Sequence, residues 1–124
     1  MKNSKIIKVS IPYEIKKSDL LSLLDSAFRY SPYWYMDDIR PNKQTSKKRD
    51  EADRFFEDVL NHGFKIKLAN NGIRAVKPSE YPVAIILLSQ KYPDHFAKFI
   101  SGEADQYTAD VFLQLLVFRK VKYG

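Results

Sequence analysis

The sequence predicts a single small α+β domain, in which a central β-hairpin or short antiparallel sheet is packed by about four helices. Three observations support this class. A strand–turn–strand pattern lies at 64–77, apolar residues recur at helical spacing in 18–28 and 50–60, and neither a repeat nor a flexible linker divides the chain. With 124 residues, of which 44% are apolar, the chain can bury one core but is too short for two ordinary domains. We therefore expect one domain over residues 1–124.

The N-terminal third predicts a strand and a helix. Ile7, Val9 and Ile11 alternate with polar residues, as in a half-buried strand that ends at Pro12. Ser18 is a favourable N-cap for a following amphipathic helix. The apolar face of this helix would comprise Leu20, Leu21, Leu24, Ala27 and Phe28. Residues 30–40 carry four aromatic side chains without a sustained period, and we expect an ordered loop or short strand there.

The middle of the chain predicts a helix followed by a hairpin. An amphipathic helix begins near Asp50, has an acidic first turn and ends before Gly63. Its apolar stripe comprises Ala52, Phe55, Phe56, Val59 and Leu60. Residues 64–68 then alternate between apolar and basic, and Asn71-Gly72 predicts a tight turn with positive φ angles before a returning strand. The outer face of this hairpin would present Lys65 and Lys67.

Further helices are expected in the C-terminal half. Ser79 is a favourable N-cap for a helix whose apolar run 83–88 predicts deep burial. A short helix over 94–101 would be closed by Gly102, and Asp105 or Thr108 would cap a last, central helix that ends near residue 118. Residues 119–123 alternate again, which predicts an edge strand with a basic outer face.

Composition limits the classes of function. The absence of cysteine excludes disulfides, thiol nucleophiles and cysteine-based zinc sites. No apolar run approaches the roughly 20 residues of a membrane-spanning helix, and no secretory signal pattern follows Met1, so we expect a cytoplasmic protein without a membrane partner. The net charge of +6 favours an acidic partner, either nucleic acid or an acidic protein surface, although such a charge also serves solubility alone.

The charges are segregated along the chain. Residues 40–49 carry five positive charges and no acid, and we expect them to form a basic, mobile loop. The next nine residues carry five acids and one arginine, mainly on the polar face of the predicted helix, where such charges are usually solvated. The basic run is the strongest electrostatic contact that the sequence offers to a polyanionic partner.

An aromatic cluster precedes this basic run. Tyr30, Tyr33, Trp34 and Tyr35 lie near arginines, a combination that stacks unpaired bases in single-strand binding proteins and also forms protein interfaces. Core packing is the alternative, and we expect it at least for Trp34. The candidate partner-binding or nucleic-acid-binding residues are therefore Tyr33, Tyr35, Arg40, Lys43, Lys47, Lys48, Arg49, Lys65 and Lys67.

Catalytic motifs are scarce. Residues 35–38 read Tyr-Met-Asp-Asp, the letters of a reverse-transcriptase metal hairpin, but that chemistry needs carboxylates from more than one segment, and an acidic turn is the simpler interpretation. A small metal-dependent nuclease that uses Asp37, Asp38 and an acid from 50–58 stays open. His62 and His95 lack metal-ligand spacing, and neither a phosphate-binding glycine loop nor a nucleophile elbow is present. We expect a non-enzymatic protein with no cofactor and no metal site.

The chain resembles a group of short phage and prophage proteins. The resemblance rests on "SPYWYMDDI", on the "NHG" before the hairpin, and on the ending "KYPDHFAKFISGEADQYTADVFLQLLVFRKVKYG". Members share a Tyr-Trp followed by Asp, a Gly-Gly before the hairpin and a "TADVFLQ…F…YG" ending. The matching positions are Tyr33, Trp34, Asp37, Gly63, Asp105, Thr108, Ala109, Asp110, Val111, Phe112, Leu113, Gln114, Phe118, Tyr123 and Gly124. This chain departs from the group at His62, where a glycine is expected, and at Arg119-Lys120, where Gly-Glu would stand.

The resemblance implies a phage setting and transfers no catalytic residue. Short phage proteins frequently bind a host machine stoichiometrically, as anti-CRISPR proteins do. Our leading hypothesis is therefore a non-enzymatic, phage-derived inhibitor that binds a CRISPR effector protein or its guide-RNA complex. The alternatives are a direct binder of RNA or single-stranded nucleic acid, the small nuclease above, and a phage structural or housekeeping adapter.

Overall fold

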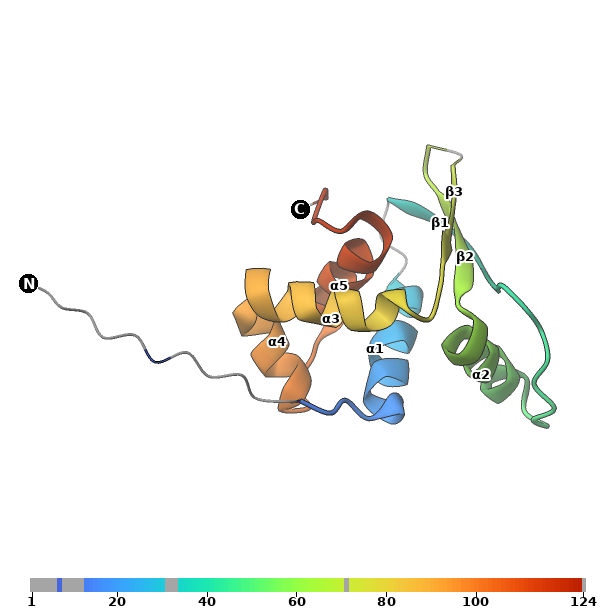
Figure 1. Ribbon diagram of the computed structural model, residues 1–124. Coiled ribbons are helices and arrows are strands. Elements are labelled where there is room, and N and C mark those ends of the chain that lie inside the picture. The colour runs from blue at the N-terminus through green and yellow to red at the C-terminus, as the bar shows by residue number, and fades with distance from the viewer. Residues whose placement is uncertain (1–6, 8–12, 31–33, 71, 124) are drawn as a thin grey trace, which may run out of the picture.

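The predicted α+β class is confirmed by a computed structural model, which describes residue 7 and residues 13–30, 34–70 and 72–123. These residues form five helices and one three-stranded antiparallel sheet with the order β1-β2-β3. In chain order the elements are α1 (Lys17–Tyr30), β1 (Tyr35–Pro41), α2 (Glu51–His62), β2 (Phe64–Leu68), β3 (Ile73–Val76), α3 (Glu80–Lys91), α4 (Pro93–Ile100) and α5 (Gln106–Phe118). Figure 1 shows the sheet and α2 at one side of the molecule and α4 at the other.

Helix α5 is the centre of the core, as its apolar sequence predicts. Its residues 108, 109 and 112–117 are buried, and α1, α3 and α4 all pack against it. The Asp105 side chain caps the helix, because its Oδ1 accepts a hydrogen bond from the Thr108 backbone N–H at 2.9 Å. Of the two predicted caps, Asp105 is therefore the correct one.

Helix α1 has the predicted amphipathic character but begins two residues earlier than a cap at Ser18 implies. Lys17 is its first residue, and the Lys16 carbonyl accepts from the backbone N–H groups of Asp19 and Leu20 at 3.0 and 3.2 Å. Ser18 therefore lies inside the helix rather than at its N-cap. The buried face comprises Leu20, Leu23, Leu24 and Ala27.

The predicted hairpin is confirmed over β2 and β3, with Phe64 opposite Val76 and Lys67 opposite Ile73. Its turn differs from the prediction, since Gly72 does not have a positive φ. Instead, the Asn70 side chain accepts a hydrogen bond from the Gly72 N–H at 3.0 Å, as in an Asx turn. Asn71 lies outside the described residues.

Strand β1 occupies Tyr35–Pro41 and thus covers the second half of the segment 30–40, in agreement with one of the two predicted conformations. Tyr35 lies opposite Leu68 and Ile39 lies opposite Ile66. Between these two pairs β1 has three residues where β2 has one, so the register shifts. The intervening residues, which include Asp37 and Asp38, form an irregularity of the strand. The acidic pair is therefore part of a strand, and the expectation of an acidic turn is wrong.

Two further predictions are wrong, and a third falls almost wholly on residues that the structure does not describe. The run 83–88 is not uniformly buried, because Val83 and Ile86 are 41% and 53% exposed while Ala84 and Leu88 are fully buried. Residues 119–123 form no strand. The predicted strand at 7–11 lies outside the described residues except for Ile7, whose side chain is exposed.

Candidate basic interface

The sheet has one face in the core and one face exposed, because side chains alternate along each strand. Phe64, Ile66 and Val76 point into the core and are fully buried. The alternate positions carry cations on the outer face, where Arg40 of β1 lies directly opposite Lys65 of β2. Two of the candidate residues that are 25 positions apart in the sequence thus become neighbours.

A shallow hollow of about 240 Å³ lies on this outer face. Its lining comprises Asp38, Arg40, Lys65, Ile66, Lys67 and Ile73. The Asp38 carboxylate accepts a hydrogen bond from Arg40 Nε at 3.1 Å, and Ile73 is 70% exposed. The face therefore combines three cations, one carboxylate and an exposed apolar side chain.

The cations on the outer face of the sheet lower the stability of the fold rather than raise it. Like charges directly opposite each other on neighbouring strands destabilise a sheet, and the pairing of Arg40 with Lys65 is such a case. Asp38 offsets part of the repulsion through its exposed ion pair with Arg40. Lys65 and Lys67 make no ion pair with an acid in the part of the chain that the structure describes.

The basic loop follows β1 and is held against α2 by a buried carboxylate. Asp58 is only 4% exposed, and its Oδ1 accepts hydrogen bonds from the backbone N–H groups of Thr45 and Ser46 at 3.1 and 2.9 Å. The Thr45 hydroxyl also lies 2.8 Å from His62 Nε2. The acids of 50–58 are mainly solvated, as expected, and Asp58 is the exception, because its oxygen accepts hydrogen bonds from the loop amides.

A second set of contacts holds the main chain of the loop near its end. Arg54 Nη1 donates to the carbonyls of Lys48 and Arg49 at 3.0 and 2.6 Å. The Lys48 ammonium lies 3.6 Å from the Glu57 carboxylate. In the described structure, the side chains of Lys43, Lys47 and Arg49 are exposed and make no ion pair with an acid.

Asn42 and Gly63 join the loop to the hairpin. Asn42 Nδ2 donates to the carbonyls of His62 and Val76 at 3.0 and 2.9 Å, and the Asn42 N–H donates to the Gly63 carbonyl at 3.0 Å. Gly63 has a φ of 79°, and a Cβ at this position would lie 1.9 Å from the Val76 carbonyl oxygen. Only glycine fits here, so Gly63 has a structural role at the junction of α2 and β2.

The aromatic candidates divide between the core and the part that is not described. Trp34 is 1% exposed, and its Nε1 donates to Asp110 Oδ1 at 2.8 Å, which confirms its expected core position. Tyr35 is 5% exposed, and its hydroxyl donates to the Ala27 carbonyl at 2.7 Å. The expectation that Tyr35 faces a partner is therefore corrected, since its ring and its hydroxyl are both used inside the fold. Tyr33 lies outside the described residues.

Several C-terminal residues that carry the resemblance also have structural roles. Gln114 is fully buried, and its Oε1 accepts from the N–H groups of Lys122 and Tyr123, both at 2.9 Å. The Tyr123 ring is stacked on Trp34, with an interplanar angle of 6° and centroids 6.1 Å apart. Gln114 Nε2 also donates to Asp110 Oδ2 at 2.9 Å. This network fixes 121–123 against α5 and explains why those residues do not form the predicted strand.

Arg74 does not belong to the basic face, although it lies on the returning strand of the hairpin that carries Lys65 and Lys67. It points to the opposite side of the sheet, where its Nη2 lies 2.6 Å from Glu80 Oε1 and its Nε donates to the Val117 carbonyl at 3.0 Å. Conversely, Ile73 was absent from the candidate residues. Its alternation with Arg74 along β3 is the sequence signal that could have placed it on the outer face.

Histidines and acids make local contacts. His95 Nδ1 lies 2.8 Å from the Thr108 hydroxyl, which in turn donates to Asp105 Oδ1 at 3.1 Å. Within the described residues, no three His, Cys, Asp or Glu side chains are grouped so that they could hold a metal ion. None of the described helices has both the length and the apolar content needed to cross a bilayer.

Comparisons with known proteins add no relative: no family model, curated protein or solved structure matches the chain.

Proposed function

We propose that this protein acts by stoichiometric binding, through a basic interface formed by the outer face of the sheet and the loop 42–50. The partner that we propose is a host ribonucleoprotein, a CRISPR effector or its guide-RNA complex, which would make the chain a phage-derived inhibitor of host defence. The observation that carries the binding role is the row of Arg40, Lys65 and Lys67 on one exposed sheet face. The identity of the partner rests on the resemblance to phage proteins.

Electrostatics supports a polyanionic partner. Cations that lack intramolecular acids can neutralise phosphates and release counterions, which is the main source of affinity for nucleic acid. In the described structure, Lys43, Lys47, Arg49, Lys65 and Lys67 have no such acid within ion-pair distance. The local repulsion between these cations would be relieved when the partner binds.

The second candidate is direct binding of RNA or single-stranded DNA. The same cations favour it, but single-strand binding usually adds aromatic side chains on which bases stack. Trp34 and Tyr35 are buried and cannot supply this platform. A ribonucleoprotein, which presents both phosphates and protein surface, fits a face of lysines, an arginine and Ile73 better than a free single strand does.

The test is an inhibition assay with purified CRISPR effector complexes from the bacterial hosts of related phages. Wild-type protein should bind at least one effector and reduce its cleavage of target nucleic acid. The double variant Lys65→Glu and Lys67→Glu should weaken binding about tenfold or more, because it reverses two charges at the interface.

A matched control separates the interface from total charge. Lys91→Glu together with Lys120→Glu changes two exposed lysines outside the sheet face, and it lowers the net charge from +6 to +2 as the first pair does. This control should bind like wild type. Failure of the wild type to bind or inhibit any effector would refute the proposed partner. An equal loss of affinity for the effector in both double variants would refute the proposed interface.

Binding to RNA alone distinguishes the second candidate. If isolated RNA binds as tightly as the ribonucleoprotein, and the affinity falls steeply as salt rises, the protein is a nucleic-acid binder. Binding that needs the effector protein, and that isolated RNA does not reproduce at the same salt concentration, supports the inhibitor.

A further inference from the structure

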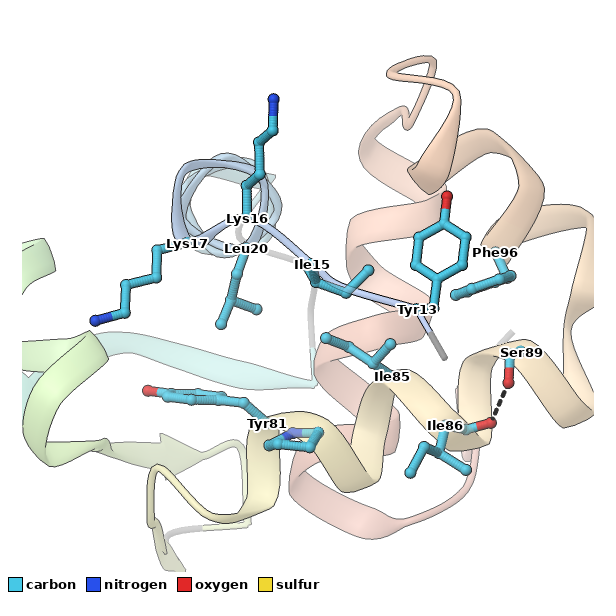
Figure 2. Close-up of a pocket in the computed structure, with 11 residues that line it drawn as sticks. Tyr13, Ile15, Lys16, Lys17, Leu20, Tyr81, Ile85, Ile86, Ser89 and Phe96 are labelled. Carbon is cyan, nitrogen blue, oxygen red and sulfur yellow. Dashed lines mark hydrogen bonds between the residues drawn. The ribbon is translucent and has the colours of Figure 1, made fainter. Parts of the chain in front are cut away.

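A second surface lies away from the basic interface, in a groove between residues 13–20, α3 and α4. Its volume is about 620 Å³, and Figure 2 shows the side chains that form it. The lining comprises Tyr13, Ile15, Lys16, Lys17, Leu20, Tyr81, Pro82, Ile85, Ile86, Ser89 and Phe96. In Figure 2, Leu20 from α1 and Ile85 from α3 point into the space between the two helices.

The groove leaves apolar side chains in contact with water. Tyr13 and Ile86 are 56% and 53% exposed, and Val83 lies one helical turn before Ile86 on α3 and is 41% exposed. A helix on a protein surface normally turns polar residues outward, whereas α3 turns Val83 and Ile86 outward. Exposed apolar side chains that line one groove, as Tyr13 and Ile86 do, are typical of a binding site.

The polar groups of the groove are poorly suited to orienting a small molecule. The Ser89 hydroxyl donates to the Ile86 carbonyl at 2.7 Å, and the Tyr81 hydroxyl donates to the Val59 carbonyl at 2.6 Å. Small-molecule sites usually present a few polar groups that converge on the ligand. Here these two hydroxyls are already used within the chain, which favours a larger apolar occupant.

The walls of the groove favour a helix as that occupant. The described lining comes from α1, α3, α4 and the segment before α1, and it includes no strand edge that could pair with an extended peptide. A helix satisfies its own backbone hydrogen bonds and needs only side-chain contacts. Along α3 the lining runs from Tyr81 to Ser89, a length of about 12 Å, which matches two turns of a docked helix.

The charges of the groove specify the flank of that helix. Among the lining residues the structure gives two lysines and no acid, and in Figure 2 the ammonium groups of Lys16 and Lys17 point outward from the apolar side chains. Neither lysine makes an ion pair with an acid in the described chain. A partner with acids beside its apolar stripe would complement them, whereas a second copy of this chain, with its net charge of +6, would add like charge.

We propose that this groove binds an amphipathic helix of a partner protein, with apolar anchors on Leu20, Ile85 and Ile86 and with acidic residues facing Lys16 and Lys17. This second surface is independent of the basic interface. It would allow the protein to hold a protein partner even where the sheet face contacts no polyanion.

The test uses a fluorescent amphipathic peptide of about four helical turns, with leucines along one stripe and glutamates on the flanks. Anisotropy should show saturable binding to the wild-type protein, and a peptide with the same leucines and lysine flanks should bind about tenfold more weakly or worse. Ile86→Glu should reduce the affinity by a similar factor. Circular dichroism and thermal unfolding should verify that each variant is folded.

Matched variants define the site. Ile73→Glu also replaces an exposed isoleucine, but on the outer face of the sheet, and should bind the peptide like wild type. The double variant Lys16→Glu and Lys17→Glu should bind the glutamate-flanked peptide more weakly than wild type does, and the lysine-flanked peptide more tightly. The proposal would be overturned if the wild type showed no saturable binding or bound both peptides equally well. It would also be overturned if Ile73→Glu lost as much affinity for the peptide as Ile86→Glu does. Concentration-dependent dimerisation that Ile86→Glu abolishes would overturn it in favour of a second copy.

Discussion

Glu80 joins three parts of the fold through one carboxylate. Its Oε1 lies 2.6 Å from Arg74 Nη2 of β3 and 2.7 Å from Arg119 Nη2 at the end of α5, and its Oε2 accepts from the Lys77 N–H at 2.6 Å. The side chain is only 16% exposed. The hydrogen bond from Arg74 is the largest cause that lowers the pKa of Glu80 from 4.5 to about 2.

This contact also explains why a non-glycine residue ends α5. Arg119 has a φ of 65°, in the left-handed region that favours glycine. The Arg119 guanidinium is held by Glu80 and by the Leu116 carbonyl, at 2.7 and 2.8 Å. These bonds offset the conformational cost of the left-handed backbone.

Replacing Glu80 should change how stability depends on pH. Because the pKa is lower in the folded protein, the ionised carboxylate stabilises the fold fully above about pH 4.5, and this contribution is lost as the pH falls toward 2. Glu80→Gln should therefore cost about 1 to 3 kcal/mol at pH 7 and much less near pH 2. Urea unfolding of both proteins at several pH values measures the difference.

The control for this prediction is Glu103→Gln, at an exposed glutamate that makes no ion pair with a described residue. Its stability difference from wild type should be small at every pH. A Glu80→Gln deficit that stays constant between pH 7 and pH 2 would show that the ion pairs are not its source.

At the scale of elements, α2 serves as the support of the basic loop. Its N-terminus is capped by Asp50, whose Oδ1 accepts a hydrogen bond from the Asp53 N–H at 3.1 Å. The buried Asp58 carboxylate of α2 accepts hydrogen bonds from two backbone N–H groups of the loop, and Arg54 of α2 donates hydrogen bonds to two loop carbonyls. The mobility expected of residues 40–49 stays a prediction, and these contacts identify which bonds would restrain it.

Removing Asp58 should release the loop. In Asp58→Ala the N–H groups of Thr45 and Ser46 lose their acceptor, and each unmade bond of this kind costs about 1 to 3 kcal/mol. Hydrogen–deuterium exchange should become faster over residues 42–50, while exchange over α5 changes less. Glu57→Ala is the matched control, because it removes only a partly exposed ion pair with Lys48. Unchanged exchange in 42–50 after loss of Asp58 would show that other contacts hold the loop.

At the scale of the whole molecule, the two proposed surfaces belong to different structural layers. The basic interface is formed by the sheet and the loop beside α2, while the groove is formed by α1, α3 and α4. In Figure 1 the sheet and α4 lie on opposite sides of α3. The buried helix α5 contacts α1, α3, α4 and β3, so it connects the two layers.

The two surfaces should act independently in binding experiments. Changes at sites far apart without shared partners usually add, so Lys65→Glu with Lys67→Glu should leave affinity for the glutamate peptide within about twofold of wild type. Ile86→Glu should likewise leave binding to the ribonucleoprotein unchanged. A combined variant whose loss exceeds the sum of the separate free-energy losses would reveal coupling through the core.

Local sequence determined most elements of this protein. The helices, the hairpin and the caps at Asp50 and Asp105 follow from side-chain periodicity and from hydrogen bonds between residues three positions apart. The end of α2 at Gly63 also follows from a local backbone requirement. For the candidate site, the sequence identified the cations, because charged side chains on a polar run or on alternate strand positions stay exposed.

Only the tertiary structure decided how individual side chains are used. The role of Tyr35 depends on a carbonyl in α1, that of Asp58 on amides of the preceding loop, and that of Arg74 on α3 and α5. The exposure of Ile86 likewise depends on which helices pack beside α3. Such contacts join residues that are distant in sequence. Local periodicity predicts which face of an element is apolar or charged, but it does not predict which distant residue will contact a given side chain.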